Sequence, residues 1–252
     1  MNKIKLMSHL VAGYPTDELA LAAADAMIEG GADILEIQLP FSDPSADGPA
    51  IQGACTKVLS RKYTTSQGLS FINKIHEKHP DTTIYIMSYG SLVYTPGVKN
   101  FCKRAAEVGV NGMIIPDLPF DHDEGLTAFC KEFGMENIPV AAPSMAEERL
   151  KKLATYGFAH IYAALRVGIT GSDTSIDKAT LDFLGKVAAG GSKVYGGFGI
   201  RSGSQAAAVA SAVDAVVAGS VFVRLITENA GDKNKMFAAV KDKATELTQG
   251  RA

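Results

Sequence analysis

Two carboxylates lie around the end of one apolar segment of the sequence. Glu36 lies inside the run GADILEIQL, whose isoleucine and leucine residues predict a buried strand. Asp47 follows in the loop FSDPSADGP, after Pro40 has ended the strand. A charge inside an apolar strand is costly unless it is paired or used. Alone, Glu36 could be a buried ion-pair partner and Asp47 a turn residue, but together they indicate acid–base chemistry on one small molecule.

Three glycine-containing loops in the last third of the chain predict a phosphate site. They are VGITGS (167–172), GGFGIRSG (196–203) and AGSVF (218–222), and each follows an expected strand. Glycines let backbone N–H groups approach an anion closely, and a helix N-terminus adds partial positive charge. One such loop would indicate only a turn. Three on one side of the molecule predict a phosphate cradle, to which the hydroxyl of Ser220 could contribute.

Strand-like and helix-like segments alternate along the whole chain and must position these groups. The expected strands, each together with the turn or loop that ends it, lie in 4–15, 31–39, 82–90, 109–119, 137–144, 160–171, 192–199 and 214–220. Eight strand-then-helix units without a linker predict a parallel sheet, and eight units in 252 residues fit a closed (β/α)8 TIM barrel with outer helices. We therefore expect a single α/β domain over residues 1–252. A doubly wound open sheet is the alternative, but no GxGxxG motif follows the first strand.

Local signals predict where several of the helices begin. Thr16, followed by two acidic residues, is expected to cap the first helix. Pro49 suits the first position of the helix after the acidic loop. Ser144 and Glu147 have the spacing of a capping box for the helix in 145–157.

In a barrel of this kind the working residues lie where strands end and the following loops begin. Candidates at such places are Glu36, Asp47, Tyr89, Asp117, Tyr162 and Thr170. No activated serine, thiol or lysine nucleophile stands out, so chemistry without a covalent intermediate is favoured. The residues thus predict a small phosphorylated metabolite whose reactive part faces the two acids.

Composition excludes several classes of protein and partner. The net charge of −2 argues against nucleic acid or an anionic membrane as partner, and the apolar runs are too short to span a bilayer. The N-terminal sequence has no signal-peptide pattern, so a cytoplasmic location is expected. Cys55, Cys102 and Cys130 are unclustered and are expected to be core thiols. The five histidines lack metal-ligand spacing, and no metal is expected.

The segment ILEIQLPFSDPSADGPAIQ (34–52) closely resembles the signature of the tryptophan synthase alpha subunit family. Shorter matches run along almost the whole chain: AGYP (12–15), IIPDLP (114–119), GITG (168–171), GGFGI (196–200) and AGSVFV (218–223). The resemblance implies cleavage of indole-3-glycerol phosphate to indole and glyceraldehyde 3-phosphate, a lyase step of tryptophan biosynthesis. It implies no cofactor in this chain.

The resemblance also implies roles for individual residues. Glu36 matches the acid–base carboxylate, and Asp47 matches the second acid, which accepts a hydrogen bond from the indole N–H. Thr170 lies on a loop that resembles a closing lid. The expected substrate-binding residues are Tyr89, Tyr162, Thr170, Gly171, Phe198, Gly199, Gly219 and Ser220.

Three residues depart from the family pattern: Gln38, His9 and Ser91, which replaces a common asparagine. Gln38 stands where a glycine is usual, and by strand alternation it points to the same side as Glu36, whose carboxylate it could hydrogen-bond. His9 stands where an aromatic residue is usual, and we interpret it as a hydrogen-bonded core histidine.

The expected partner is a tryptophan synthase beta subunit, which carries pyridoxal phosphate, in an α2β2 complex. The loops FSDPSADGP and 95–97 would form the contact. An alternative, motivated by Gln38 and His9, is a catalytically weak alpha-like subunit that mainly activates its partner. A further alternative, another phosphate-binding barrel such as an epimerase or isomerase, predicts metal ligands or a catalytic lysine at strand ends, and we find neither in the sequence.

Overall fold

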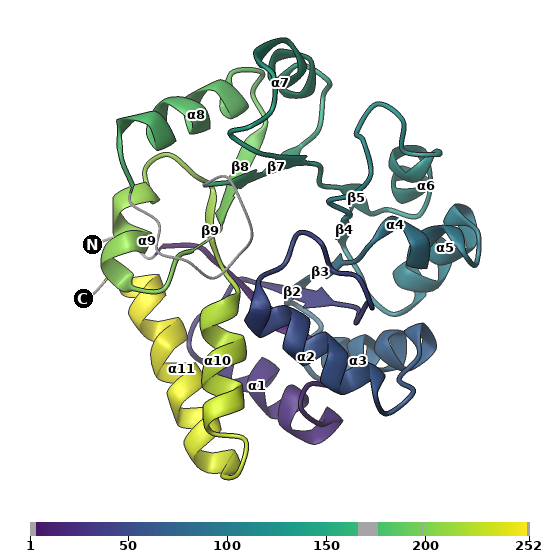
Figure 1. Ribbon diagram of the computed structural model, residues 1–252, viewed down its shortest axis with the longest axis vertical. Coiled ribbons are helices and arrows are strands. Elements are labelled where there is room, and N and C mark those ends of the chain that lie inside the picture. The colour runs from purple at the N-terminus through teal and green to yellow at the C-terminus, as the bar shows by residue number, and fades with distance from the viewer. Residues whose placement is uncertain (1–3, 166–175, 198, 251–252) are drawn as a thin grey trace.

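Parallel strands curl into a barrel surrounded by helices (Figure 1). The computed structural model describes residues 4–165, 176–197 and 199–250. Its strands run in the order β5-β4-β3-β2-β1-β9-β8-β7-β6. They are β1 (Leu6–Val11), β2 (Ile34–Gln38), β3 (Thr83–Met87), β4 (Gly112–Ile114), β5 (Glu136–Asn137), β6 (Val140–Ala141), β7 (His160–Ala164), β8 (Lys193–Gly197) and β9 (Ala215–Ala218). Each of the eight expected strand segments contains at least one of them, so the predicted parallel barrel is confirmed.

The fifth expected strand is split into β5 and β6, and this split segment closes the barrel. β5 pairs with β4, whereas β6 pairs with β7. Pro139 between them has no N–H to donate, so it interrupts the ladder. On either side of the interruption, Ile138 N donates to Met113 O at 2.8 Å and Tyr162 N donates to Pro139 O at 2.9 Å. One segment therefore joins both ends of the sheet.

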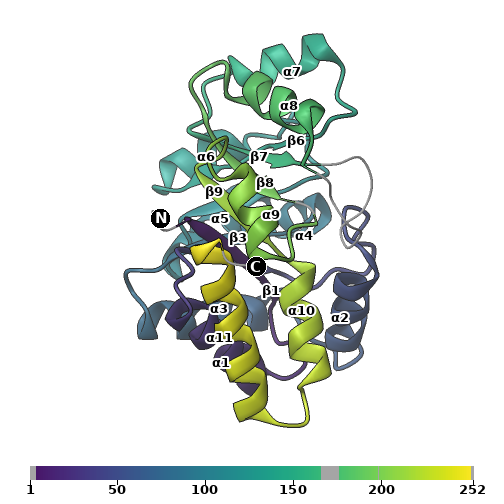
Figure 2. The ribbon, with the colours of Figure 1, turned by 90° about the vertical axis from the view of Figure 1, so that its left-hand side faces the viewer.

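The helices form the outer layer of the barrel (Figures 1 and 2). They are α1 (Asp17–Glu29), α2 (Pro49–Leu59), α3 (Thr65–Lys78), α4 (Gly90–Tyr94), α5 (Val98–Glu107), α6 (Leu126–Glu132), α7 (Glu147–Ala154), α8 (Lys178–Ala188), α9 (Gly203–Val209), α10 (Ser220–Glu228) and α11 (Lys233–Gln249). The five-residue α4 was not predicted, because it is too short to show a helical period. No helix in the described residues combines the length and the apolar character needed to cross a membrane.

Local capping signals were correct for the first helix and wrong for the seventh. Thr16 Oγ1 accepts a hydrogen bond from Leu19 N, as predicted. The Ser144 capping box does not form, because α7 begins at Glu147 after Ala146, which offers no side-chain cap. A turn in which Met145 N donates to Ala142 O separates Ser144 from the helix, and Ser144 lines a cavity instead.

A polar cluster fills the barrel toward the N-terminal ends of the strands. Tyr85 Oη donates to Glu136 Oε1 at 2.6 Å and lies 3.0 Å from Tyr195 Oη. His160 Nδ1 lies 2.7 Å from Glu136 Oε2, and its ring stacks on Tyr195. Because this cluster occupies one end of the interior, the space for a ligand lies at the other end, where the strands finish.

Candidate active site

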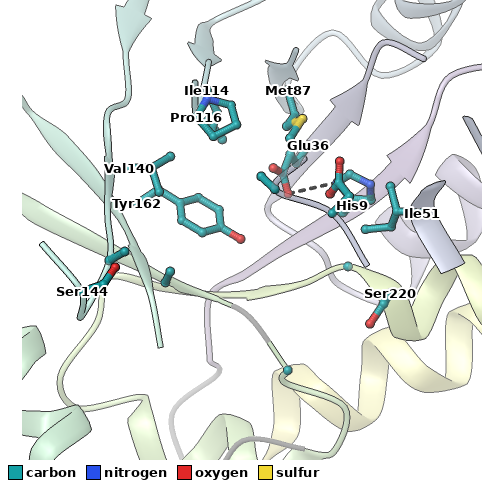
Figure 3. Close-up of a pocket in the computed structure, with 16 residues that line it drawn as sticks. His9, Glu36, Ile51, Met87, Ile114, Pro116, Val140, Ser144, Tyr162 and Ser220 are labelled. Atoms are coloured by element: carbon teal, nitrogen blue, oxygen red, sulfur yellow. Dashed lines mark ion pairs between the residues drawn. The ribbon is translucent and has the colours of Figure 1, made fainter. Parts of the chain in front are cut away.

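A cavity of about 270 Å³ lies at the C-terminal ends of the strands (Figure 3). This volume is near the lower end of the range for small-molecule sites. Its walls come from β1, β2, β3, β4, β6 and β7, from α2 and the loop before it, and from the segments that follow β4, β6, β8 and β9. Six of the predicted site residues line it, together with His9: Glu36, Asp47, Tyr162, Gly199, Gly219 and Ser220. The cavity therefore brings together groups that are up to 211 positions apart in the chain, from His9 to Ser220.

Glu36 points into the cavity from the middle of β2, next to His9 on β1. The two residues are direct register partners in the parallel β1–β2 pair. His9 Nδ1 lies 3.3 Å from Glu36 Oε2, and both residues are buried. The strand's apolar neighbours explain the burial of Glu36, since Ile34 lies inside the barrel and Leu35 and Ile37 face the helices. The carboxylate is thus held by the sheet, with an imidazole beside it.

Asp47 is also buried, and the structure holds its carboxylate from two sides. Gln38 Nε2 donates to Asp47 Oδ2 at 2.8 Å, and Tyr89 Oη donates to the same oxygen at 2.7 Å. Burial raises the pKa of Asp47, and the nearby charge of His9 and these two hydrogen bonds offset that rise only in part. The main chain is fixed as well, because Gln52 Nε2 donates to Asp47 O at 2.7 Å.

This arrangement changes the interpretation of Gln38 and Tyr89. By strand alternation Gln38 could have reached the Glu36 carboxylate, but its amide nitrogen donates to Asp47 and lies 3.6 Å from Cys55 Sγ. Tyr89, a predicted ligand contact, is not among the residues that line the cavity. Its hydroxyl instead supports Asp47 and accepts a hydrogen bond from Ala46 N at 3.2 Å. Both side chains therefore fix the position of the Asp47 carboxylate.

Tyr162 extends into the cavity from β7, on the side opposite β1 and β2 (Figure 3). Burial raises the pKa of its phenol well above the usual value, and the charges of Glu36 and Asp47 raise it further. The hydroxyl is therefore protonated at neutral pH.

The predicted phosphate side of the site is formed by Gly199, Gly219 and Ser220. Gly199 has a φ of +93°, which strongly favours glycine. Gly219 is the N-cap of α10, and buried Ser220 is the first residue of that helix. A helix start that opens on a cavity offers N–H groups and partial positive charge to an anion. The other three predicted residues, Thr170, Gly171 and Phe198, lie outside the described residues.

A further expectation concerns a residue near the cavity. Asp117 accepts hydrogen bonds from Gly90 N at 2.9 and 3.0 Å, so it organises the start of α4.

His9 and Ser144 line the cavity although neither was predicted to do so. Strand alternation could have indicated His9, because it lies two residues after the interior residue Met7. Ser144 carried no such signal.

Comparison with known proteins gives a consistent result. The family model of the tryptophan synthase alpha chain matches residues 1–251. The tryptophan synthase alpha chain of Helicobacter hepaticus is 40% identical over 233 residues, which is 90% of this chain and 87% of the relative. The structure of Mycobacterium tuberculosis tryptophan synthase contains a chain with a TM-score of 0.88 and 31% identity, covering 99% of this chain and 93% of that one.

A second solved structure is similar over nearly the full length of both chains. It is described as the tryptophan synthase α2β2 complex of the hyperthermophile Pyrococcus furiosus and concerns mutual activation within that complex. The match has a TM-score of 0.86 and 29% identity, and covers 98% of this chain and 99% of that one.

Proposed function

Since the chain belongs to the tryptophan synthase alpha chain family, we propose that its cavity cleaves indole-3-glycerol phosphate to indole and glyceraldehyde 3-phosphate. The observation that carries this proposal is the cavity itself, in which Glu36 and Asp47 face the same space as Gly219 and Ser220 at the start of α10. Two acids and a phosphate cradle that open on one cavity suit a substrate with an indole ring at one end and a phosphate at the other.

The reaction requires two proton movements, and we assign both to Glu36. The hydroxyl on the carbon next to the indole gives its proton to the Glu36 carboxylate, and that carbon becomes the carbonyl of glyceraldehyde 3-phosphate. Ring C3 must gain a proton while the C–C bond is still intact, which places positive charge on the indole ring, and the electron pair of the breaking C–C bond then passes into the ring and neutralises that charge. Glu36 supplies that proton, so no net proton is consumed and no covalent intermediate is needed.

Asp47 and Tyr162 complete the reacting end of the site. Asp47 accepts a hydrogen bond from the indole N–H and stabilises the positive charge that develops on the ring when C3 is protonated. Its support by Gln38 and Tyr89 fixes the carboxylate before substrate arrives. Tyr162, protonated and neutral, offers a donor near Glu36 without adding charge.

The phosphate end gives the first testable consequence. We expect Ser220→Ala to raise KM for indole-3-glycerol phosphate by about tenfold with little change in kcat, because one hydrogen bond to a charged group is lost. Steady-state kinetics of indole release measures both parameters. Ser192→Ala is the control, since Ser192 is also buried but donates to Phe158 O, toward the other end of β8. An equal rise in KM in both variants would contradict the role of Ser220.

Gly197 gives a second consequence, because it leaves room for Tyr162. A methyl group on Gly197 would lie 2.4 Å from Tyr162 Oη and 2.9 Å from Val217 Cβ. We expect Gly197→Ala to displace the phenol and to lower kcat/KM by about ten- to a hundredfold. Gly196→Ala is a matched control on the other face of β8, where the added methyl would meet Val213 Cγ1 at 2.7 Å. Both changes lower Tm, and similar losses of activity in the two variants would show that Tyr162 is not the cause.

The partner proposed for this chain is a tryptophan synthase beta subunit, as in the complex from Pyrococcus furiosus. The chemistry assigned here uses only side chains of this chain, and pyridoxal phosphate belongs to the beta subunit. We propose a cytoplasmic location, which the three free, buried cysteine thiols support.

The test of the proposed function is indole release by the wild-type chain with a beta subunit present. Release of indole and glyceraldehyde 3-phosphate in equal amounts is the expected result. No turnover, combined with activation of the beta subunit, would support the alternative of a catalytically weak activating subunit.

A further inference from the structure

His9 occupies a place in the cavity that an ordinary core histidine would not need. It is only 3% exposed, and its Nδ1 lies against Glu36 Oε2. Its other ring nitrogen, Nε2, is buried and has no hydrogen-bond partner among the described residues. Buried polar groups are normally satisfied, so a histidine that serves packing alone would engage both nitrogens. We therefore attribute the position of the His9 side chain to a role in the cavity and not to packing alone.

The sheet fixes the geometry of the His9–Glu36 pair. Parallel pairing puts the two residues side by side with both side chains inside the barrel. Gly219 lies close to the imidazole, since a Cβ added there would be 3.5 Å from His9 Cβ and 3.6 Å from its Cγ. Gly219, between the end of β9 and the start of α10, therefore limits the movement of the ring, and His9 holds one carboxylate oxygen of Glu36 while the other is left for a ligand.

The charges around His9 favour its protonated form. Burial lowers the pKa of His9, but the charge and hydrogen bond of Glu36, together with the charge of Asp47, raise it, and the net direction is upward. The other titratable groups nearby are Tyr162 from β7 and Cys55 from α2, and burial raises the pKa of each, that of Cys55 to about 12. Both are neutral at neutral pH. Among the described residues that line the cavity, His9 is the one that can carry positive charge.

We propose that His9 is a positioning residue for Glu36, which as an imidazolium orients the carboxylate and keeps it ionised until the substrate hydroxyl gives up its proton. This inference rests on the proposed function. His9 keeps its own proton throughout the step, so the proton that leaves the hydroxyl is the one that Glu36 delivers to ring C3.

The pH profile of His9→Gln tests this role. Loss of a neighbouring cation favours the protonated form of a buried carboxylate. We expect the acidic limb of the kcat/KM profile to move up by about one pH unit, and kcat near neutral pH to fall about tenfold with KM within about twofold. The matched control is His160→Gln, a strand histidine with its own carboxylate partner, Glu136, outside the cavity. An acidic limb that stays in place, or that moves equally in the control, would overturn the proposal.

A measurement without substrate separates this inference from the proposed function. The titration of the His9 imidazole can be followed by NMR in the wild type and in Glu36→Gln. We expect the midpoint to fall by at least about one pH unit in the variant, because the largest favourable charge is removed. The exposed His122 serves as the internal control. An unchanged His9 midpoint would overturn the pairing, whereas a shifted midpoint in a chain that releases no indole would count against the proposed function alone.

Discussion

Replacing Glu36 by glutamine is expected to lower kcat for indole release by on the order of 10³-fold, with KM changed by less than about threefold. Glutamine keeps the shape of the side chain but cannot take the hydroxyl proton or return one to ring C3. Because Glu36 performs both proton transfers, the glutamine variant can perform neither of them. The measurement is steady-state release of indole from indole-3-glycerol phosphate with the beta subunit present, followed over the full substrate range.

The control for Glu36→Gln must separate lost chemistry from lost structure. Glu136→Gln makes the same change at a second barrel carboxylate, which bonds Tyr85 and His160 away from the cavity. Its kcat should stay within about twofold of the wild type. Thermal unfolding of both variants shows whether the protein in each assay is folded, so that a lower kcat can be assigned to lost chemistry. If Glu36→Gln retains more than a tenth of wild-type kcat, Glu36 is not the acid–base group.

Replacing Asp47 by asparagine is expected to have opposite effects on activity and stability. The asparagine is neutral, so it cannot stabilise positive charge on the indole ring, and kcat/KM should fall about a hundredfold. The raised pKa of Asp47 means that the folded state binds its proton more tightly than the unfolded state does. Above the folded-state pKa the buried carboxylate therefore costs stability. Asparagine removes that cost, and Tm at pH 7 should rise by about 2–4 °C.

The pH dependence of stability checks the sign of this argument. The gain of Asp47→Asn should be present at pH 7 and should shrink as pH falls through the folded-state pKa. It should vanish below the ordinary carboxyl pKa, where the aspartate is protonated in both states. Asp43→Asn, an exposed change in the same loop, should leave Tm unchanged at either pH. A lower Tm for Asp47→Asn at pH 7 would show that its hydrogen bonds from Gln38 and Tyr89 outweigh its burial.

Sequence alone predicted the parts of this structure that depend on local signals. The strand that carries Glu36 follows from its apolar run, and the start of α1 follows from Thr16. The barrel follows from the repeated alternation of strands and helices. The split at Pro139 also has a local cause, but its consequence depends on which strands lie to either side. Closure of the barrel through the segment of β5 and β6 could therefore not be predicted from Pro139 alone.

The pairing of side chains inside the site could not be predicted in the same way. His9 meets Glu36 because β1 and β2 pair in one particular register, which the sequence of neither strand specifies. Gln38 reaches Asp47 rather than Glu36 because the loop after β2 folds back over the strand end. Tyr89 reaches Asp47 from the start of α4, just after β3 and 42 residues away in the chain. These contacts depend on tertiary geometry, and they determine how each acid is held.

The central claim is that Glu36 and Asp47 act on one end of a substrate whose phosphate lies at the start of α10. A crystal structure with a non-cleavable analogue of indole-3-glycerol phosphate tests it most directly. We predict an Asp47 carboxylate oxygen within hydrogen-bond distance of the indole nitrogen, a Glu36 oxygen facing the glycerol chain, and the phosphate against Gly219 and Ser220. An analogue bound outside this cavity, or bound with its phosphate beside the two acids, would contradict the account.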